Sequence, residues 1–334
     1  MEKKRILVIG AGPLGSVLAA RLYQGGQNVS ILARGERLKQ IQEFGIILHD
    51  VVTDETSTDP VPVVEMFTPE DQYDLVVIVM RKNHALALLP TLEKNQHVKS
   101  FLFLGNNAAG PEELTTQLGT ERVLIGFPNA AGYLEGNVIH CIAGQENDTA
   151  AIPFGESDGT VKPRTHMVAG ILASAPGYTA EIYTNMDAWL RTHVALLFPT
   201  LSRAITVCGH SRLRLLQTRD GLLLYIRSLR ECLSVLKALG YPILPKKFRY
   251  ISWLPEPLLL WIFKKIFSNE LMETAMDRHA DAAESEILHL QQEFQRLVDQ
   301  SGIAAPTLDR LIQMIEHGET LPVGSRSIPL RLFI

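Results

Sequence analysis

The chain has few cysteines, no large excess of charge of one sign, and no apolar run long enough to cross a bilayer. Its three cysteines, Cys141, Cys208 and Cys232, are odd in number and far apart among 334 residues. Such spacing provides neither a disulfide framework nor the closely paired ligands of a zinc site. We therefore expect no disulfide, no metal site and a reducing location, the cytoplasm.

The charge balance argues against a nucleic-acid partner. The formal net charge is −4 and the isoelectric point is near 6.2, so no global positive field would attract a phosphate backbone. Local basic clusters do occur, and we interpret them as solvated faces. They are Lys246, Lys247 and Arg249, and further along Lys264 and Lys265.

Two apolar segments are candidates for membrane contact. The N-terminal run MEKKRILVIGAG is too short, and too soon broken by glycine, for a signal peptide. Segment 253–267, WLPEPLLLWIFKKIF, contains two prolines and two lysines and is too short to span a bilayer. It favours a buried or interface helix over one on a membrane surface, so we expect no membrane partner.

Residues 5–34 have the pattern of a strand, a helix and a second strand. A glycine-rich turn lies between the first strand and the helix, where it permits close backbone approach to a pyrophosphate at the helix N-terminus. The alternative is a turn that only packs and binds nothing. The context favours dinucleotide binding by the six residues of the turn: Gly10, Ala11, Gly12, Pro13, Leu14 and Gly15.

The end of the second strand indicates which dinucleotide binds. A site that prefers NAD has an acidic residue there for the ribose hydroxyls, but this chain has Arg34 between Ala33 and Gly35. A guanidinium can pair bidentately with the 2′-phosphate of NADP. The sequence therefore predicts NADP(H), the alternative being a solvated Arg34 with Glu36 at the ribose.

Three further apolar runs predict parallel strands that are buried on both faces. Ligands bind beyond the carboxyl ends of such strands, and polar or small residues follow each run. Ordinary loop chemistry could explain any one of these clusters, but three at corresponding positions favour a binding crevice. The strands are 74–80, 100–105 and 122–127, followed by RKNH (81–84), NNAAG (106–110) and PNAAG (128–132).

The second half of the chain is predicted to be helical. The length suggests two domains, and the strand signal fades near residue 183, so we place a nucleotide-binding domain at 1–182 and a helical substrate and dimerisation domain at 183–334. Pro199 should kink or end the helix of segment 186–201, MDAWLRTHVALLFPTL. Further helices are expected at 219–240, 271–300 and 307–318.

Several motifs resemble the ketopantoate reductase (2-dehydropantoate 2-reductase) family. They are GAGPLGS, ILARGERL, NNAAGPEEL, AWLRTHV, and ESEILHLQQEF followed by GIAAPTLDRL. The resemblance implies an α/β Rossmann domain with a mostly parallel sheet, followed by an all-α domain like the C-terminal domain of 6-phosphogluconate dehydrogenase. It further implies that NADPH reduces a 2-oxo acid to a 2-hydroxy acid in the interdomain cleft, here ketopantoate to pantoate or a related substrate.

The resemblance also assigns residues to the cofactor. Asn106 corresponds to the family asparagine that lies between cofactor and substrate, and Ala131 to a small residue near the nicotinamide. Arg81 takes the place of a lysine that approaches the cofactor, and Lys82 beside it could substitute.

Two more assignments lie in the helical half. Glu286 corresponds to a family glutamate that touches the cofactor, while Leu288 replaces the aspartate that follows it in the family motif. Thr274 falls near a serine that hydrogen-bonds substrate.

The departure of most consequence lies in the segment AWLRTHV. The family has a lysine as general acid and, four residues on, a substrate-binding asparagine, where this chain has Arg191 and Ala195. Arginine's pKa is too high for ready proton transfer, but its charge could stabilise the oxyanion that hydride transfer creates, with the proton coming from water or from His193. Alternatively, His193 is a core or partner-facing histidine and Arg191 pairs with a structural carboxylate, Glu286 or Asp277.

Three functions remain open. The first is an NADPH-dependent reductase of a small 2-oxo acid, with Arg191, Glu286 and Asn106 as catalytic residues and Thr274 as a further substrate contact. The second is a catalytically impaired NADP(H)-binding sensor or partner-binding protein of the same fold. The third is a dehydrogenase of the 6-phosphogluconate type, which the motifs NNAAGPEEL and ESEI disfavour. A homodimer is also expected, since the family often dimerises and the segment around Trp253 and Trp261 offers an apolar surface.

Overall fold

The computed structural model describes residues 3–145, 148–269 and 284–331. The chain folds into two compact units. The first contains Met1–Asn106 and Gly110–Asp187, and the second contains Asn107–Ala109 and Ala188–Ile334. Three residues in the middle of the first half therefore belong to the second unit.

The first unit is an α/β domain built on two sheets. Its strands are β1 (Arg5–Ile9), β2 (Asn28–Leu32), β3 (Ile46–Asp50), β4 (Glu55–Asp59), β5 (Val63–Val64), β6 (Leu75–Ile78), β7 (Phe101–Leu104), β8 (Val123–Gly126), β9 (Ala131–Glu135), β10 (Val138–Ile142), β11 (Ala150–Glu156) and β12 (Tyr178–Ile182). Its helices are α1 (Pro13–Gln24), α2 (Gly35–Phe44), α3 (Lys82–Lys94), α4 (Glu112–Leu118), the short 3-10 helix η1 (Thr120–Arg122) and α5 (Pro163–Leu172).

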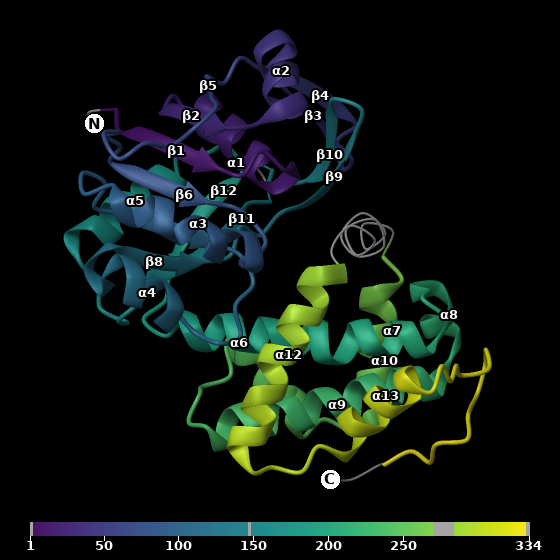
Figure 1. Cartoon of the computed structure of the whole chain (residues 1–334). Helices are drawn as coiled ribbons and strands as arrows, with labels where there is room; N and C mark the ends of the chain where they lie inside the picture. Colours follow the sequence, from purple (N-terminus) through teal and green to yellow (C-terminus); the bar gives the residue numbers. More distant parts are fainter. Residues whose placement is uncertain (1–2, 146–147, 270–283, 332–334) are drawn as a thin grey trace. The chain divides into compact units, whose positions relative to one another are not determined.

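The large sheet has the strand order β12-β11-β8-β7-β6-β1-β2-β5 (Figure 1). The six strands from β8 to β5 are parallel, and β11 runs antiparallel to β8. All residues of β6, β7 and β8 are buried, as the continuous apolar runs predicted. From β1 the chain adds β2 and then β5 on one side, and it later adds β6, β7 and β8 on the other side. Dinucleotides bind at such a change of side, which here lies between β1 and β6.

A second, smaller sheet was not predicted. It has the order β4-β3-β10-β9, and helix α1 contacts strands of both sheets. The sequence signal was weak because β4, ETSTD, contains no apolar residue and only Asp59 of it is buried. Ala131, which was expected in a loop after a strand, instead begins β9, where it pairs with Ile142.

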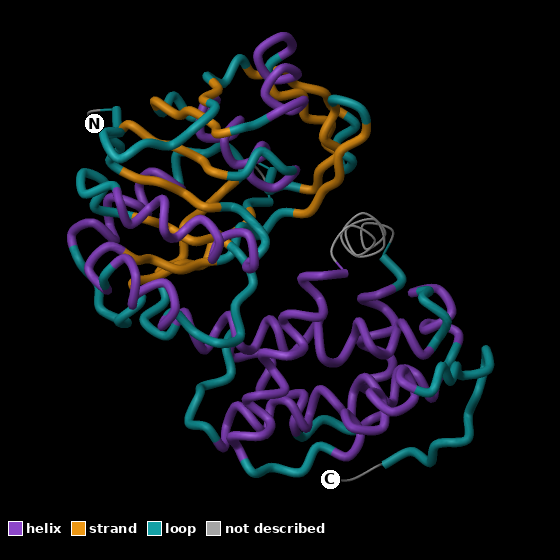
Figure 2. Tube along the Cα trace, viewed as in Figure 1, coloured by secondary structure: helices purple, strands orange, loops and turns teal. Residues whose placement is uncertain are grey.

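The described part of the second unit contains helices joined by loops and no strand (Figure 2). Its core contains apolar side chains from most of the helices and also Ala108, which is fully buried. The predicted fold class, a Rossmann-type domain followed by a helical domain, is confirmed. The elements are α6 (Met186–Leu196), the π-helix η2 (Leu197–Ser202), α7 (Arg203–Val207), α8 (Arg212–Gln217), α9 (Arg219–Ala238), the 3-10 helix η3 (Lys246–Ser252), α10 (Glu256–Phe267), α12 (Glu284–Ser301) and α13 (Pro306–Glu316).

Pro199 interrupts the helix near the predicted position. Helix α6 ends at Leu196, and the chain widens into the π-helix η2, which contains Pro199, before α7 begins. Proline has no N–H to give to the carbonyl four residues earlier, and the carbonyl of Ala195 accepts a hydrogen bond from Thr200 Oγ1 at 2.7 Å. The side-chain hydroxyl thus replaces the missing backbone donor.

Among residues 3–145, 148–269 and 284–331, no helix is both long and apolar enough to cross a membrane. The three cysteines are all buried and free.

Candidate nucleotide and catalytic site

The glycine loop joins β1 to α1, and its three glycines meet different surroundings. Gly10 has φ +116°, and a Cβ on it would lie 2.2 Å from the carbonyl oxygen of Val79, just past β6. A Cβ on Gly15 would lie 1.9 Å from the carbonyl oxygen of Gly10. A Cβ on Gly12 would meet nothing within 4 Å. Gly10 and Gly15 are therefore required by the fold, whereas Gly12 leaves space open in front of the loop.

That space lies at the N-terminus of α1. Gly12 is the residue before the helix, Pro13 occupies its first position, and the first turn contains no acidic side chain. Backbone N–H groups and the helix dipole make such an end attractive to an anion. The loop therefore fits a pyrophosphate in charge and in available space.

Two arginines follow the end of β2. Arg34 is exposed at the start of α2, and Glu36 beside it is exposed too. Arg37, three residues after Arg34 and one helical turn away, is partly buried, and burial lowers its pKa. Its Nε donates to the carbonyl oxygen of Ala11 at 3.3 Å, and its Nη2 to Ser16 Oγ at 3.4 Å. Sequence reasoning missed Arg37, although its spacing from Arg34 was visible.

The residues after β6 lie close to the glycine loop. Besides its contact with Val79, a Cβ on Gly10 would lie 3.0 Å from Met80 Cγ. Arg81 precedes the first residue of α3, and Lys82 is buried with its Nζ 3.5 Å from Glu113 Oε2. Lys82 is therefore held by α4, the helix that follows β7.

Asn106 comes two residues after β7 and is partly buried. It is the last residue of its segment in the first unit, and the next three residues pack in the second. Of the predicted cofactor residues, the glycine loop, Arg34, Arg81, Lys82, Asn106 and Ala131 all belong to the first unit.

Arg191 lies on α6 and is buried, with 2% of its surface exposed. Its Nη1 donates to the carbonyl oxygen of Ala108 and its Nη2 to that of Ala109, the latter at 2.9 Å. Its guanidinium also lies over the Tyr241 ring, 4.3 Å from the centroid. Two of its five N–H groups thus bond the main chain of the NNAAG segment, an arrangement that the sequence did not suggest.

Glu293, on α12, accepts hydrogen bonds from the backbone amides of the same two residues. Its Oε2 accepts from the N–H of Ala108 at 3.1 Å and of Ala109 at 3.2 Å, while its Oε1 lies 3.1 Å from His289 Nε2. Glu293 is 3% exposed. It was also missed from the sequence, although it stands seven residues after Glu286 and so on the same face of the helix.

The remaining predicted residues of the helical unit have mixed positions. Glu286 is buried near the start of α12, and Leu288 is exposed. Ala195 is fully buried in the helical core. Thr274 and Asp277 lie outside the residues that the structure describes.

His193 stacks on Trp189 with ring centroids 5.3 Å apart, two residues from Arg191 on α6. Burial lowers its pKa from 6.5 to about 4. The imidazole is therefore neutral near pH 7, as expected of a histidine packed into the protein.

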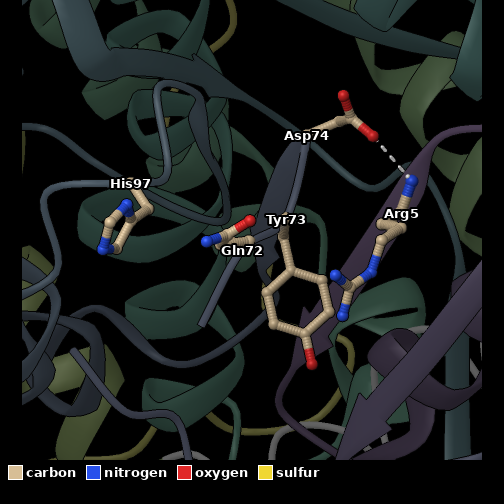
Figure 3. Close-up of a pocket in the computed structure, with 5 residues that line it drawn as sticks. All are labelled: Arg5, Gln72, Tyr73, Asp74 and His97. Carbon is tan, nitrogen blue, oxygen red and sulfur yellow. Dashed lines mark hydrogen bonds between the residues drawn. The ribbon is translucent and has the colours of Figure 1, made fainter. Parts of the chain in front are cut away.

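A separate open hollow of about 340 Å³ lies at the amino ends of the central strands β1 and β6 (Figure 3). It is lined by Arg5, the first residue of β1, by Gln72, Tyr73 and Asp74 before β6, and by His97 before β7. The N–H of Arg5 donates to Asp74 Oδ2 at 2.8 Å. Because ligands in such sheets bind at the carboxyl ends, we assign it no role in the site. Within the described parts of the chain, no cluster of acidic, histidine or cysteine side chains is arranged to hold a metal.

Comparison with known proteins identifies related sequences. Residues 6–153 match the sequence model of a family described as ketopantoate reductase PanE/ApbA. The uncharacterized oxidoreductase YkpB of Bacillus subtilis (strain 168) is 25% identical over 193 residues, which cover 55% of this chain and 60% of that protein. The chain thus matches less than two thirds of that relative's length. The resemblance predicted from the motifs is confirmed over residues 6–153, and both matches are to oxidoreductases.

Solved structures share the fold along nearly the whole chain. A D-mandelate dehydrogenase with NADH and anilino(oxo)acetate has a TM-score of 0.74 at 17% identity, covering 94% of this chain and 97% of that one. A 2-dehydropantoate 2-reductase from Geobacter metallireducens GS-15 has a TM-score of 0.70 at 20% identity, covering 94% and 99%. At these identities the comparison establishes the fold alone.

Proposed function

We propose that this chain, whose first half matches the ketopantoate reductase family, is an NADPH-dependent reductase that converts a small 2-oxo acid into a 2-hydroxy acid. The observation that carries the proposal is the glycine loop. Its first and third glycines are needed for packing, but its second has open space before it at a helix N-terminus. A loop that served packing alone would not need that glycine.

The two arginines after β2 support NADPH over NADH. Arg34 is exposed where the ribose of a bound dinucleotide would lie, and Arg37 adds a second positive charge beside the loop. Two cations favour a 2′-phosphate, whereas an NAD site has a carboxylate there. A neighbour of the same fold was solved with NADH, so the fold itself does not exclude NADH, and the preference for NADPH rests on these two arginines.

When bound, NADPH supplies a hydride to the carbonyl carbon of the 2-oxo acid. The carbonyl oxygen then gains negative charge and takes up a proton from water, since His193 is neutral near pH 7. We assign Asn106 to the nicotinamide end and Glu286 to cofactor contact, as the family resemblance implies. Arg191 provides a fixed positive charge rather than a proton, because its pKa is too high for general acid catalysis.

The substrate is ketopantoate or a related 2-oxo acid. Two family features are changed, since arginine stands at the position of the lysine and Ala195 at that of the asparagine. Ala195 is fully buried and offers no amide to a ligand. The neighbour solved with anilino(oxo)acetate contains another small oxo acid in the same fold. Both points favour a related substrate as strongly as ketopantoate itself.

A catalytically impaired NADP(H)-binding protein is the second candidate. The observation that favours it is that Arg191, at the position of the family's proton donor, is buried and bonded to main-chain carbonyls. Such a protein would retain the glycine loop and bind NADPH without consuming it.

The test is NADPH consumption by the wild type and by Arg191→Lys, first with ketopantoate and then with a panel of other 2-oxo acids. The proposal predicts consumption by the wild type with at least one of these acids. Activity with ketopantoate in the lysine variant alone would mean that the natural substrate differs. NADPH binding without consumption of any acid by either protein would overturn the reductase proposal in favour of the binding protein.

A further inference from the structure

The three-residue segment Asn107–Ala109 belongs to the helical unit, although it follows the strand β7 in sequence. Ala108 is fully buried in the helical core. Buried backbone groups need partners, because an unpaired one costs nearly as much as a lost hydrogen bond. For Ala108 and Ala109 the partners are charged side chains.

Those side chains come from two different helices. Arg191 of α6 donates to both carbonyl oxygens, and Glu293 of α12 accepts from both amides. Both charged side chains are buried. The main chain of Ala108 and Ala109 therefore lies between a buried positive charge and a buried negative charge. Hydrogen bonds to ionised groups are about twice as strong as neutral ones, and burial strengthens them further.

We propose that Glu293 is a positioning residue for the reaction, acting with Arg191 as a clamp on the main chain of Ala108 and Ala109. The first clamped residue, Ala108, stands two positions after Asn106, which the proposed function places at the nicotinamide end. Because the chain is fixed from the second residue after Asn106 onward, the clamp restricts the orientation of the Asn106 side chain. This inference rests on the proposed function for its catalytic consequence, but the clamp itself can be tested without any substrate.

The clamp also accounts for arginine at the position of the family's lysine. An ammonium group is a point charge, whereas a planar guanidinium can bond two neighbouring carbonyl oxygens at once, as Arg191 does. The stacking of Arg191 on Tyr241 further fixes the plane of the guanidinium. Arg191 and Glu293 together bond both carbonyl oxygens and both amides of Ala108 and Ala109. A lysine at position 191 would not bond both carbonyl oxygens in the same way.

The first experiment measures hydrogen–deuterium exchange of the Ala108 and Ala109 amides in the wild type, Glu293→Gln and Glu256→Gln. Glu256 is a matched control, because it is a buried carboxylate of the same unit that pairs with Arg227 at 2.8 Å. We expect protected amides in the wild type and about tenfold to hundredfold faster exchange in Glu293→Gln, the factor for a hydrogen bond to a charged group. The Glu256→Gln variant should leave these two amides protected.

The second readout is functional. With NADPH bound, Glu293→Gln should change the nicotinamide fluorescence and lower kcat about tenfold or more, while the Kd for NADPH stays within about threefold, because the pyrophosphate contacts lie elsewhere. If Glu293→Gln does not fold, Glu293→Asp, which keeps the charge but shortens the reach, takes its place.

The outcomes separate the two proposals. Unprotected amides in the wild type, or equal exchange in Glu293→Gln and Glu256→Gln, would overturn the clamp. Faster exchange in Glu293→Gln with unchanged kcat and fluorescence would overturn the positioning role. If the wild type does not bind NADPH, the proposed function fails and the positioning role fails with it, while the exchange data alone decide the clamp.

Discussion

Single residues at the glycine loop show how one motif combines folding and binding. Gly10 and Gly15 are fixed by contacts within the fold, and only Gly12 borders open space. The motif was recognised from sequence because spacing alone defines it. Arg37 and Glu293 were not, because each acts through backbone atoms of a residue far away in the chain, Ala11 and Ala108. A sequence pattern records neither partner.

Arg34 should determine the preference for NADPH over NADH. Its side chain is exposed and makes no capping hydrogen bond, so Arg34→Ala should change the free energy of unfolding by no more than about 0.5 kcal/mol. Loss of a charged contact to the 2′-phosphate should lower the ratio of NADPH to NADH affinity about tenfold to hundredfold. Titrations of both dinucleotides measure the ratio.

Arg37→Ala is the comparison for this prediction. It should also destabilise the loop, because Arg37 bonds Ala11 and Ser16. If the preference for NADPH survives in Arg34→Ala and disappears in Arg37→Ala, the phosphate contact belongs to Arg37.

For the helices, the sequence predicted where a helix is buried and interrupted, but not which groups its polar side chains contact. Segment 186–201 was correctly expected to be a mostly buried helix with an interruption near Pro199, because apolar side chains on all sides and a proline are both visible in sequence. The partners of its one buried cation were not visible, because they are carbonyl oxygens, which every residue has. The small sheet was not predicted either, because its strand β4 contains no apolar residue that would mark it as a strand.

Helix α13 should depend on Glu231 of α9. The Glu231 carboxylate accepts from the N–H of Thr307 at 2.9 Å and of Leu308 at 2.9 Å, at the positive end of α13. We expect Glu231→Gln to lower the free energy of unfolding by about 1–2 kcal/mol. Thermal unfolding of this variant beside Glu316→Gln, an exposed glutamate at the other end of α13, measures the effect. Equal shifts in both would contradict the capping role.

His193 on α6 should make stability depend on pH. Its pKa is about 4 in the folded protein and 6.5 for a free histidine, so between these values the unfolded chain binds more protons. Stability should therefore be intact above pH 6.5 and fall as pH drops toward 4, by about 2 kcal/mol.

The check is unfolding between pH 7 and pH 4 in the wild type, His193→Gln and His317→Gln. His317 is exposed and follows α13. His193→Gln should lose part of the pH dependence and His317→Gln should keep it. An unchanged pH profile in His193→Gln would show that the histidine titrates normally.

For the whole molecule, the sequence predicted two domains and the main buried strands of the sheet, because buried parallel strands are strongly patterned. It did not predict that Asn107–Ala109 would belong to the helical unit. The segment is only three residues long, and the side chains that bond its main chain, Arg191 and Glu293, come from helices far away in the sequence. Its neighbour Asn106 was nevertheless assigned from the family resemblance.

A homodimer is expected through the segment around α10. Trp253 is 59% exposed and Trp261 is 63% exposed, and large apolar side chains in such a group favour a protein–protein contact. Sedimentation should show a dimer for the wild type and a shift toward monomer for Trp261→Glu, because a buried, unpaired carboxylate opposes association. A wild type that remains monomeric at high concentration would contradict this expectation.

The most direct test of the central claim is an NADPH titration of the wild type, Gly12→Val and Gly15→Ala. The account predicts that Gly12→Val folds with an unchanged melting temperature, because its side chain meets no protein atom at Cβ, yet loses NADPH binding since the side chain enters the pyrophosphate space. Gly15→Ala should instead be destabilised, because its Cβ would lie 1.9 Å from a carbonyl oxygen. Binding of NADPH to Gly12→Val with wild-type affinity would contradict the account.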